Sequence, residues 1–216
     1  MSDKPSGVYG AVAIAAVLSL VVNGLRLYGE LNHWETVVLG KNLFSTAAVG
    51  GGSLLGITFL VPICGFWFGR RLAKNGARPQ ATGKSLLLHL LGIALAGGIG
   101  FVAMGTDLID GWRMKGLVAF VGASVSGLLA LKAWPRAYFV NLLYGLLARA
   151  PVVLIQFVAI RKGWDTHFSK AAPMVPTDPD SLLFALTLAQ STLWPFGFTV
   201  LVGGLFAAIG AATVRH

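Results

Sequence analysis

The sequence predicts an all-α integral membrane protein, a bundle of six transmembrane helices that forms a single domain. Apolar residues make up 56% of the 216 residues and charged residues only 12%, about half of the roughly 25% found in soluble domains. The apolar residues gather in continuous runs of about 20 residues, the length that crosses a bilayer core as a helix. They do not alternate every second residue, as the strands of a membrane barrel do. Water-soluble, disordered and disulfide-stapled classes are therefore excluded.

Six runs meet this requirement. The expected spans are residues 8–28, 51–69, 85–105, 116–134, 138–160 and 181–214. The last run is longer than one crossing needs and contains Pro195, whose ring removes a backbone donor and clashes with the preceding turn. We therefore expect the run to break or kink near Trp194–Pro195.

The segment at residues 31–50 is moderately apolar but contains Glu35, Lys41 and Asn42. We interpret it as an interfacial or re-entrant segment on the outer side, with Trp34 and Phe44 at headgroup depth. If it crossed the membrane instead, the chain would have seven helices and the opposite orientation of its N-terminus.

The distribution of charge predicts the orientation. Cytoplasmic loops of membrane proteins are enriched in Lys and Arg, and the connection between the second and third spans is basic without a single acid. The side of that connection carries Lys4, Arg70, Arg71, Lys74, Arg78, Lys84, Lys132, Arg136 and Arg215, against Asp3 alone. The other side carries Arg26, Lys41, Arg113, Lys115, Arg161, Lys162 and Lys170, balanced by Glu30, Glu35, Asp107, Asp110, Asp165, Asp178 and Asp180. The sequence therefore predicts both termini in the cytoplasm, in a membrane of the bacterial inner-membrane type.

Small residues recur every four positions in several spans, the pattern that lets membrane helices pack closely. Examples are Gly65 with Gly69, Gly92 with Ala96 and Gly100, Ala119 with Ala123 and Gly127, and Gly203 with Ala207 and Ala211. We expect most of these seams to lie inside the bundle. The same pattern suits contacts with a second copy of the chain or with other membrane subunits.

Arg149 is the candidate functional residue, because it lies near the middle of the fifth span. A charge at that depth costs about 2.5–3.5 kcal/mol on insertion scales and usually faces the bundle interior. Tyr138, Asn141 and Gln156 project from nearly the same helical face, so we predict a ligand-binding surface that includes them. The alternative is an arginine that pairs structurally with a carbonyl or hydroxyl, or that reaches the interface.

The first span carries a second polar stripe, formed by Ser19, Asn23, Arg26 and Glu30 at helical spacing. We interpret its outer end as an interfacial anchor, in which Arg26 and Glu30 form a weak pair four residues apart. A sharper hypothesis places Asn23 and Arg26 against the Arg149 face, so that the two stripes enclose one polar cavity.

The other polar residues do not predict a metal site or a catalytic site. We interpret His89 as a histidine with its hydrogen bonds satisfied inside the third span, with a proton relay as the alternative. His33 and His167 on the outer side lack the spacing of a metal-binding motif, so no metal or other cofactor is expected. The chain also lacks a paired nucleophile and base, which argues against an enzyme.

The sequence thus predicts a small carrier or ligand-binding membrane protein with a polar cavity around Arg149. Its ligand would be an anionic or amphipathic small molecule or lipid. The alternative is an accessory or scaffold subunit of a larger membrane complex. Membrane lipids are the expected partners in either case. The basic net charge of +9 is explained by membrane sidedness and does not indicate nucleic acid.

Overall fold

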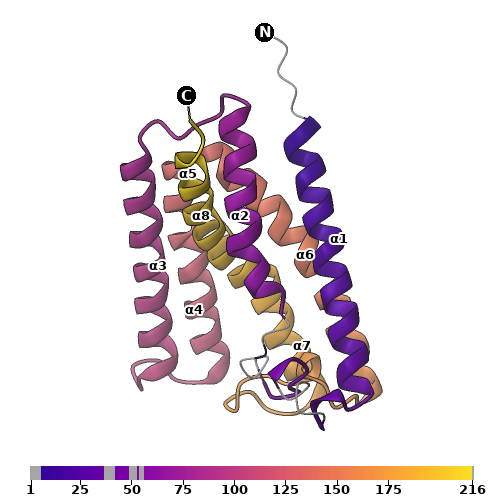
Figure 1. The fold of residues 1–216 in the computed structure, drawn as a ribbon. Coiled ribbons are helices and arrows are strands. Elements are labelled where there is room, and N and C mark those ends of the chain that lie inside the picture. Colours follow the sequence, from indigo (N-terminus) through magenta and orange to yellow (C-terminus); the bar gives the residue numbers. More distant parts are fainter. Residues whose placement is uncertain (1–5, 37–41, 49–52, 54–55, 216) are drawn as a thin grey trace.

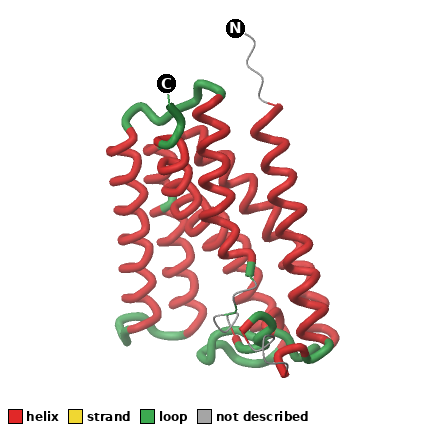
Figure 2. The backbone as a smooth tube through the Cα atoms, in the orientation of Figure 1, coloured by secondary structure: helices red, strands yellow, loops and turns green. Residues whose placement is uncertain are grey.

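The computed structural model describes residues 6–36, 42–48, 53 and 56–215. These residues form helices joined by loops and turns, and the described part of the chain contains no strand (Figures 1 and 2). The long helices are α1 (Ser6–Leu31), α2 (Ile57–Lys74), α3 (Thr82–Gly105), α4 (Trp112–Ser126) and α6 (Pro135–Lys162), and the shorter ones are α5 (Leu128–Ala133), α7 (Pro179–Leu188) and α8 (Val200–Ala212). Single 3-10 turns occur at η1 (Trp34–Thr36) and η4 (His167–Ser169), and η5 (Ala189–Thr199) is π-helical.

Five helical stretches are long and apolar enough to cross a membrane. They are Gly7–Leu31, Thr82–Gly105, Trp112–Ala133, Pro135–Lys162 and Pro179–Ala212. The remaining predicted span appears as α2, which begins six residues later than expected and carries Arg70, Arg71 and Lys74 near its end. This short and charged helix is not among the five candidates. The structure therefore confirms a helical protein with several helices that are long and apolar enough to cross a membrane, whereas the count of six spans stays a prediction.

The chain stays helical at Pro195, where the sequence predicts a break or a kink. α7, η5 and α8 follow one another without interruption, and Pro195 lies inside the π-helical segment. The wider π-type turn, with hydrogen bonds five residues apart, accommodates a residue without a backbone N–H and lets the helix continue. α7 itself begins at Pro179, where the Asp178 side chain accepts a hydrogen bond of 2.9 Å from the backbone N–H of Ser181.

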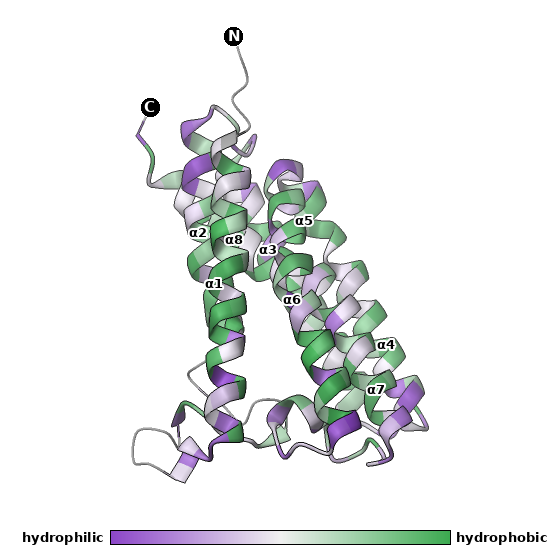
Figure 3. Cartoon of the chain, turned by 90° about the vertical axis from the view of Figure 1, so that its right-hand side faces the viewer, coloured by the Kyte–Doolittle hydropathy of each residue, from purple (hydrophilic) through white to green (hydrophobic). Residues whose placement is uncertain are grey.

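The ends of the bundle differ in charge, as the sequence predicts. The start of α1, the α2–α3 connection, the α5–α6 junction and the end of α8 lie at one end, which we call the basic end (Figure 1). The connections after α1, α3 and α6 lie at the opposite end, which we call the loop end. Figure 3 shows hydrophilic residues at both ends and apolar residues along the helices between them. Which end faces the cytoplasm stays a prediction.

The segment after α1 lies at the loop end, and its residues 37–41 and 49–50 are outside the described residues. Its described residues form η1 and an irregular stretch. Trp34 packs edge-on between Tyr28 and Phe44, at ring-centroid distances of 5.4 Å and 5.1 Å. Trp34 is 36% exposed, but Phe44 is 7% exposed and packs against Gly29. The Phe44 ring is thus buried against α1, and its predicted headgroup depth stays a prediction.

The tightest helix pair is α2 with α8, and small residues make it possible. Gly65 lies against the backbone of Gly203, and Gly69 lies against the backbone of Ala207, so that a Cβ atom at either glycine would overlap with it. At the basic end, the Arg70 side chain donates a hydrogen bond of 2.5 Å to Thr213 Oγ1. The small-residue seam between α2 and α8 thus lies inside the bundle. By contrast, Gly97 and Gly98 of α3 face open space.

The α2–α8 seam generates a testable prediction. Gly69→Ala places a methyl group against the Ala207 carbonyl, and we expect it to lower the free energy of unfolding by about 1–3 kcal/mol. Gly98→Ala is the matched control, because a Cβ atom there meets nothing within 4 Å. The measurement is the midpoint of thermal unfolding in detergent micelles. Equal midpoints for the two variants would contradict the seam.

Candidate functional site

Arg149 lies on α6, about 20 Å along the helix from its end at Lys162, given a rise of 1.5 Å per residue. Its side chain is buried, with 7% of the residue exposed. Nη1 donates a hydrogen bond of 3.1 Å to Gln190 Oε1, and the guanidinium carbon lies 4.1 Å from the centre of the Trp194 ring. A desolvated contact of this cation–π kind contributes about 2 kcal/mol. Both partners come from the π-helical segment η5.

The groups that stabilise the charge of Arg149 are neutral: the Gln190 amide and the Trp194 ring. Within the described residues, no Asp or Glu forms an ion pair with Arg149, and its Nη2 atom has no hydrogen-bond partner. A buried cation is normally compensated by an anion or by a full set of hydrogen bonds. The structure therefore leaves part of the binding capacity of this guanidinium unused.

Arg149 lines a cavity of about 320 Å³ in the half of the bundle nearer the loop end. This volume lies at the lower end of the range of small-molecule sites. Helices α1, α4, α6 and α7, segment η5 and the connection after η4 all contribute to its wall. Its basic and amide lining residues are Asn23, Arg26, Arg113, Arg149, Gln156, His167, Lys170 and Gln190. No acidic residue is found among the described residues that line it.

The structure brings together four of the six predicted binding residues. Arg149, Gln156, Asn23 and Arg26 all line the cavity, as the sharper of the two hypotheses about α1 predicts. Asn23 Nδ2 and Gln156 Oε1 are buried without a hydrogen-bond partner among the described residues.

Tyr138 and Asn141 do not belong to this site. They share a face of α6 with Arg149, but Tyr138 lies eleven residues away, which is about 16 Å along a helix. Tyr138 packs in an apolar cluster with Val200 and Leu201, and Asn141 donates a hydrogen bond of 2.9 Å to the Ala137 carbonyl. Asn141 also abuts Gly203 of α8. The prediction that these two residues line the site is not supported, because residues on one helical face can lie at very different depths.

Sequence reasoning did not include Gln190 and Trp194 in the site. They are four residues apart on η5, which places them on one side of the helix next to Arg149. A signal was available, because a glutamine and a tryptophan just before Pro195 form an unusual polar and aromatic pair in an apolar run. Nothing in the sequence indicated which helix they would face.

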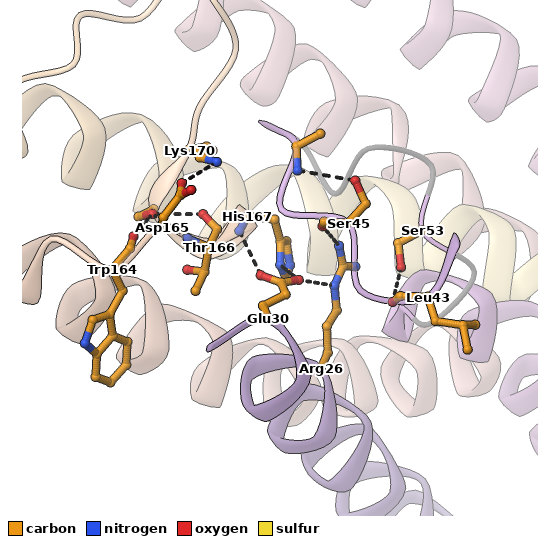
Figure 4. Close-up of polar contacts among 12 residues, drawn as sticks. Arg26, Glu30, Leu43, Ser45, Ser53, Trp164, Asp165, Thr166, His167 and Lys170 are labelled. Atoms are coloured by element: carbon orange, nitrogen blue, oxygen red, sulfur yellow. Dashed lines mark hydrogen bonds and ion pairs between the residues drawn. The ribbon is translucent and has the colours of Figure 1, made fainter. Parts of the chain in front are cut away.

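A second buried polar cluster joins Arg26, Glu30 and His167 (Figure 4), and Arg26 and His167 also line the cavity. Glu30 is fully buried and accepts hydrogen bonds from Arg26 Nε at 2.7 Å and from the backbone N–H of His167 at 2.9 Å. Its carboxylate also lies 2.5 Å from His167 Nδ1. Arg26 Nη2 donates to the Ser45 carbonyl at 3.1 Å. Glu30 therefore joins α1 to the connection that follows α6. The predicted Arg26–Glu30 pair is present and buried, and the interfacial position of Arg26 stays a prediction.

The environment of His167 favours its neutral form. Burial lowers the pKa of His167 below its ordinary value of 6.5, and this outweighs the opposite effect of the hydrogen bond to Glu30. The positive charge of Arg26 acts in the same direction as burial. On its own connection, Lys170 is paired with Asp165 at 2.5 Å. The neutral imidazole thus donates from Nδ1 to Glu30.

The other histidines singled out from the sequence, His89 and His33, lie outside the cavity lining. His89 is buried in α3, where Nδ1 lies 2.7 Å from the Ser85 carbonyl and the ring abuts Gly204. This agrees with a histidine satisfied within the bundle. His33 contacts Glu35 and not His167. Among the residues that the structure describes, no three His, Cys, Asp or Glu side chains form a potential metal site.

Comparison of the chain with protein families, with curated proteins and with solved structures finds no match in any of the three. The functional argument therefore rests on the geometry of the cavity.

The Glu30 cluster predicts a large effect on stability. Glu30→Ala leaves Arg26 buried without its carboxylate, and we expect it to lower the free energy of unfolding by about 3–5 kcal/mol. Asp180→Ala is the control, because it breaks the exposed pair with Arg161, which has a separation of 3.7 Å. The control is expected to cost at most about 1 kcal/mol. Denaturant unfolding in micelles measures both, and a Glu30 variant as stable as the control would refute the role of the cluster.

His167 predicts a dependence of stability on pH. Its pKa is lower in the folded than in the unfolded protein, so the unfolded state binds more protons. The contribution of His167 is therefore fully present above its ordinary pKa, and it is lost progressively as the pH falls from that value through the lower pKa of the folded protein. The thermal midpoint of the wild type should fall more than that of His167→Gln between about pH 7.5 and about pH 5. Parallel pH profiles for the two proteins would contradict this assignment.

Proposed function

We propose that the protein is a small carrier or ligand-binding membrane protein, which takes an anionic or amphipathic molecule into the cavity around Arg149. The observation that carries the proposal is the combination of a buried guanidinium without an anionic partner and a cavity without acidic lining residues in the described part of the chain. Such a site attracts a negative charge and repels a positive one. An anion in the cavity would supply the partner that Nη2 of Arg149 lacks.

The position of the cavity supports exchange of a ligand with one side of the membrane. Arg149 lies deep along α6, whereas Arg26 and His167 lie at the loop end. Asn23 and Gln156 lie between them along their helices, so that polar groups line the cavity at successive depths. We further propose that the basic end faces the cytoplasm of an inner membrane, in accordance with the positive-inside rule.

A second candidate function is that of a subunit in a larger membrane complex. The observation that favours it lies on α3, where Gly97 and Gly98 have no neighbour within 4 Å and the adjoining Phe101 is 70% exposed. Small residues on an outer helix face permit close approach of another helix. Lipid would cover the same face in a protein that acts alone, so the cavity carries the leading proposal.

Native mass spectrometry from mild detergent tests the proposal. We expect the wild type to retain an anionic ligand, and Arg149→Gln to lose it with an affinity reduced about tenfold or more, as for a hydrogen bond to a charged group. Arg161→Gln is the matched control, because Arg161 lies on the same helix, next to Phe157 and outside the cavity.

Equal retention by all three proteins would refute a site at Arg149. A stoichiometric second protein in the spectrum, without a retained ligand, would favour the subunit function instead.

A further inference from the structure

We infer that the ligand of the cavity is a singly charged amphipathic oxyanion, whose carboxylate or phosphate head lies against α1 and α6 and whose apolar body lies against α4, α7 and η5. This inference rests on the proposed function and narrows it, because the proposal alone admits a bare inorganic anion as well as an amphipathic molecule.

The two sides of the cavity differ in chemistry. The side formed by α1 and α6 presents Asn23, Arg26, Arg149 and Gln156. The lining residues from α4, α7 and η5 are mainly apolar, among them Phe120, Leu188 and Leu193, and we call this part of the lining the apolar side. On that side, Gln190 is engaged with Arg149, and Arg113 lies at the surface over the rings of Trp112 and Phe184. A bare ion would leave the apolar side without a partner, whereas an amphipathic ligand covers both sides.

The charge of the lining argues for a single negative charge on the ligand. Two of its buried or partly buried cations are already compensated, Arg26 by Glu30 and Lys170 by Asp165. Arg149 is the buried cation in this lining for which the described residues provide no carboxylate. A dianion would bring one charge more than Arg149 neutralises, and burying an unpaired charge is costly.

The unpartnered polar atoms define the head group further. Arg149 Nη2 and Asn23 Nδ2 are donors and Gln156 Oε1 is an acceptor, and all three belong to side chains that are more than nine-tenths buried. An oxyanion provides acceptors for the two donors. A protonated phosphate oxygen, or a hydroxyl next to a carboxylate, provides a donor for Gln156.

The chain carries its own reporter for a test, because Trp194 stacks on Arg149 at the site. We use 9,10-dibromostearate as the probe, since bromine atoms quench tryptophan fluorescence at contact. The methyl ester of the same acid has the same apolar body without the charge, and it measures quenching from simple partition into the micelle. Acetate and inorganic phosphate supply the charge without the body. Palmitate and hexadecyl methyl phosphate, a phosphodiester with a single negative charge, are competitors that differ in the head group.

We expect saturable quenching by the acid in excess of that by its ester. Palmitate or hexadecyl methyl phosphate should reverse it, and displacement by either one supports the inference and identifies the head group. Acetate and inorganic phosphate should not reverse it at the same concentrations. Arg149→Gln should weaken the saturable component by about ten- to a hundredfold, whereas Arg161→Gln should change it less than about twofold, as for an exposed charge outside the site.

The outcomes separate this inference from the proposed function. Displacement by acetate or phosphate as effective as by palmitate would overturn the amphipathic ligand and leave an anion site at Arg149 standing. Equal quenching by acid and ester would overturn the inference, because the charge of the amphipathic probe would then not be recognised. No saturable quenching by the acid would overturn the inference alone, since the ligand retained in native mass spectrometry decides the proposed function independently.

Discussion

The burial of one guanidinium group in an apolar bundle is the constraint on which the rest of the structure depends. Arg149 is too deep in α6 to be solvated at either end, so its charge must be satisfied inside the protein. Gln190 and Trp194 satisfy it in part, by a hydrogen bond and by the face of a ring. Both lie on η5, and the contact between α6 and η5 therefore combines packing with charge stabilisation.

The π-helical geometry of η5 belongs to the same arrangement. Pro195 follows Trp194 directly, and an α-helix would be kinked or broken there. The π-type turn keeps the helix continuous while it presents Gln190 and Trp194 to Arg149. Segments of this kind are frequent at functional sites. Beyond η5, α8 packs against α2 through Gly203 and Ala207, which fixes the position of the whole segment relative to the bundle.

A second buried charge, the Glu30 carboxylate, stabilises the loop end. Unlike Arg149, it is compensated by an ion pair. Glu30 meets Arg26 on its own helix and His167 on the connection after α6, so that the carboxylate joins distant parts of the chain. The two clusters differ in whether their arginine is paired with a carboxylate. Arg26 is neutralised where the cavity approaches the loop end, and Arg149 keeps its charge at depth. Arg149 is therefore the residue in this cavity that attracts an anion most strongly.

The sequence by itself determined the membrane class, the positions of five apolar helices to within a few residues, the separation of charge between the two ends, and Arg149 as the residue of interest. These follow from composition and from the periodicity of the helix, which act locally along the chain. Sequence spacing also grouped Tyr138 and Asn141 with Arg149, and it predicted a break or kink at Pro195. Tyr138 and Asn141 lie away from the cavity because a helical face extends through the full depth of a bundle, and the chain stays helical at Pro195 because that residue lies inside a π-type turn.

Only the tertiary structure decided that Asn23 and Arg26 meet Arg149 in one cavity, that Gln190 and Trp194 are its partners, and that Glu30 binds His167. These pairs are separated by up to 137 positions along the chain. No local pattern specifies which helices become neighbours, because that choice depends on the close packing of small residues and on the compensation of buried charge between helices far apart in sequence.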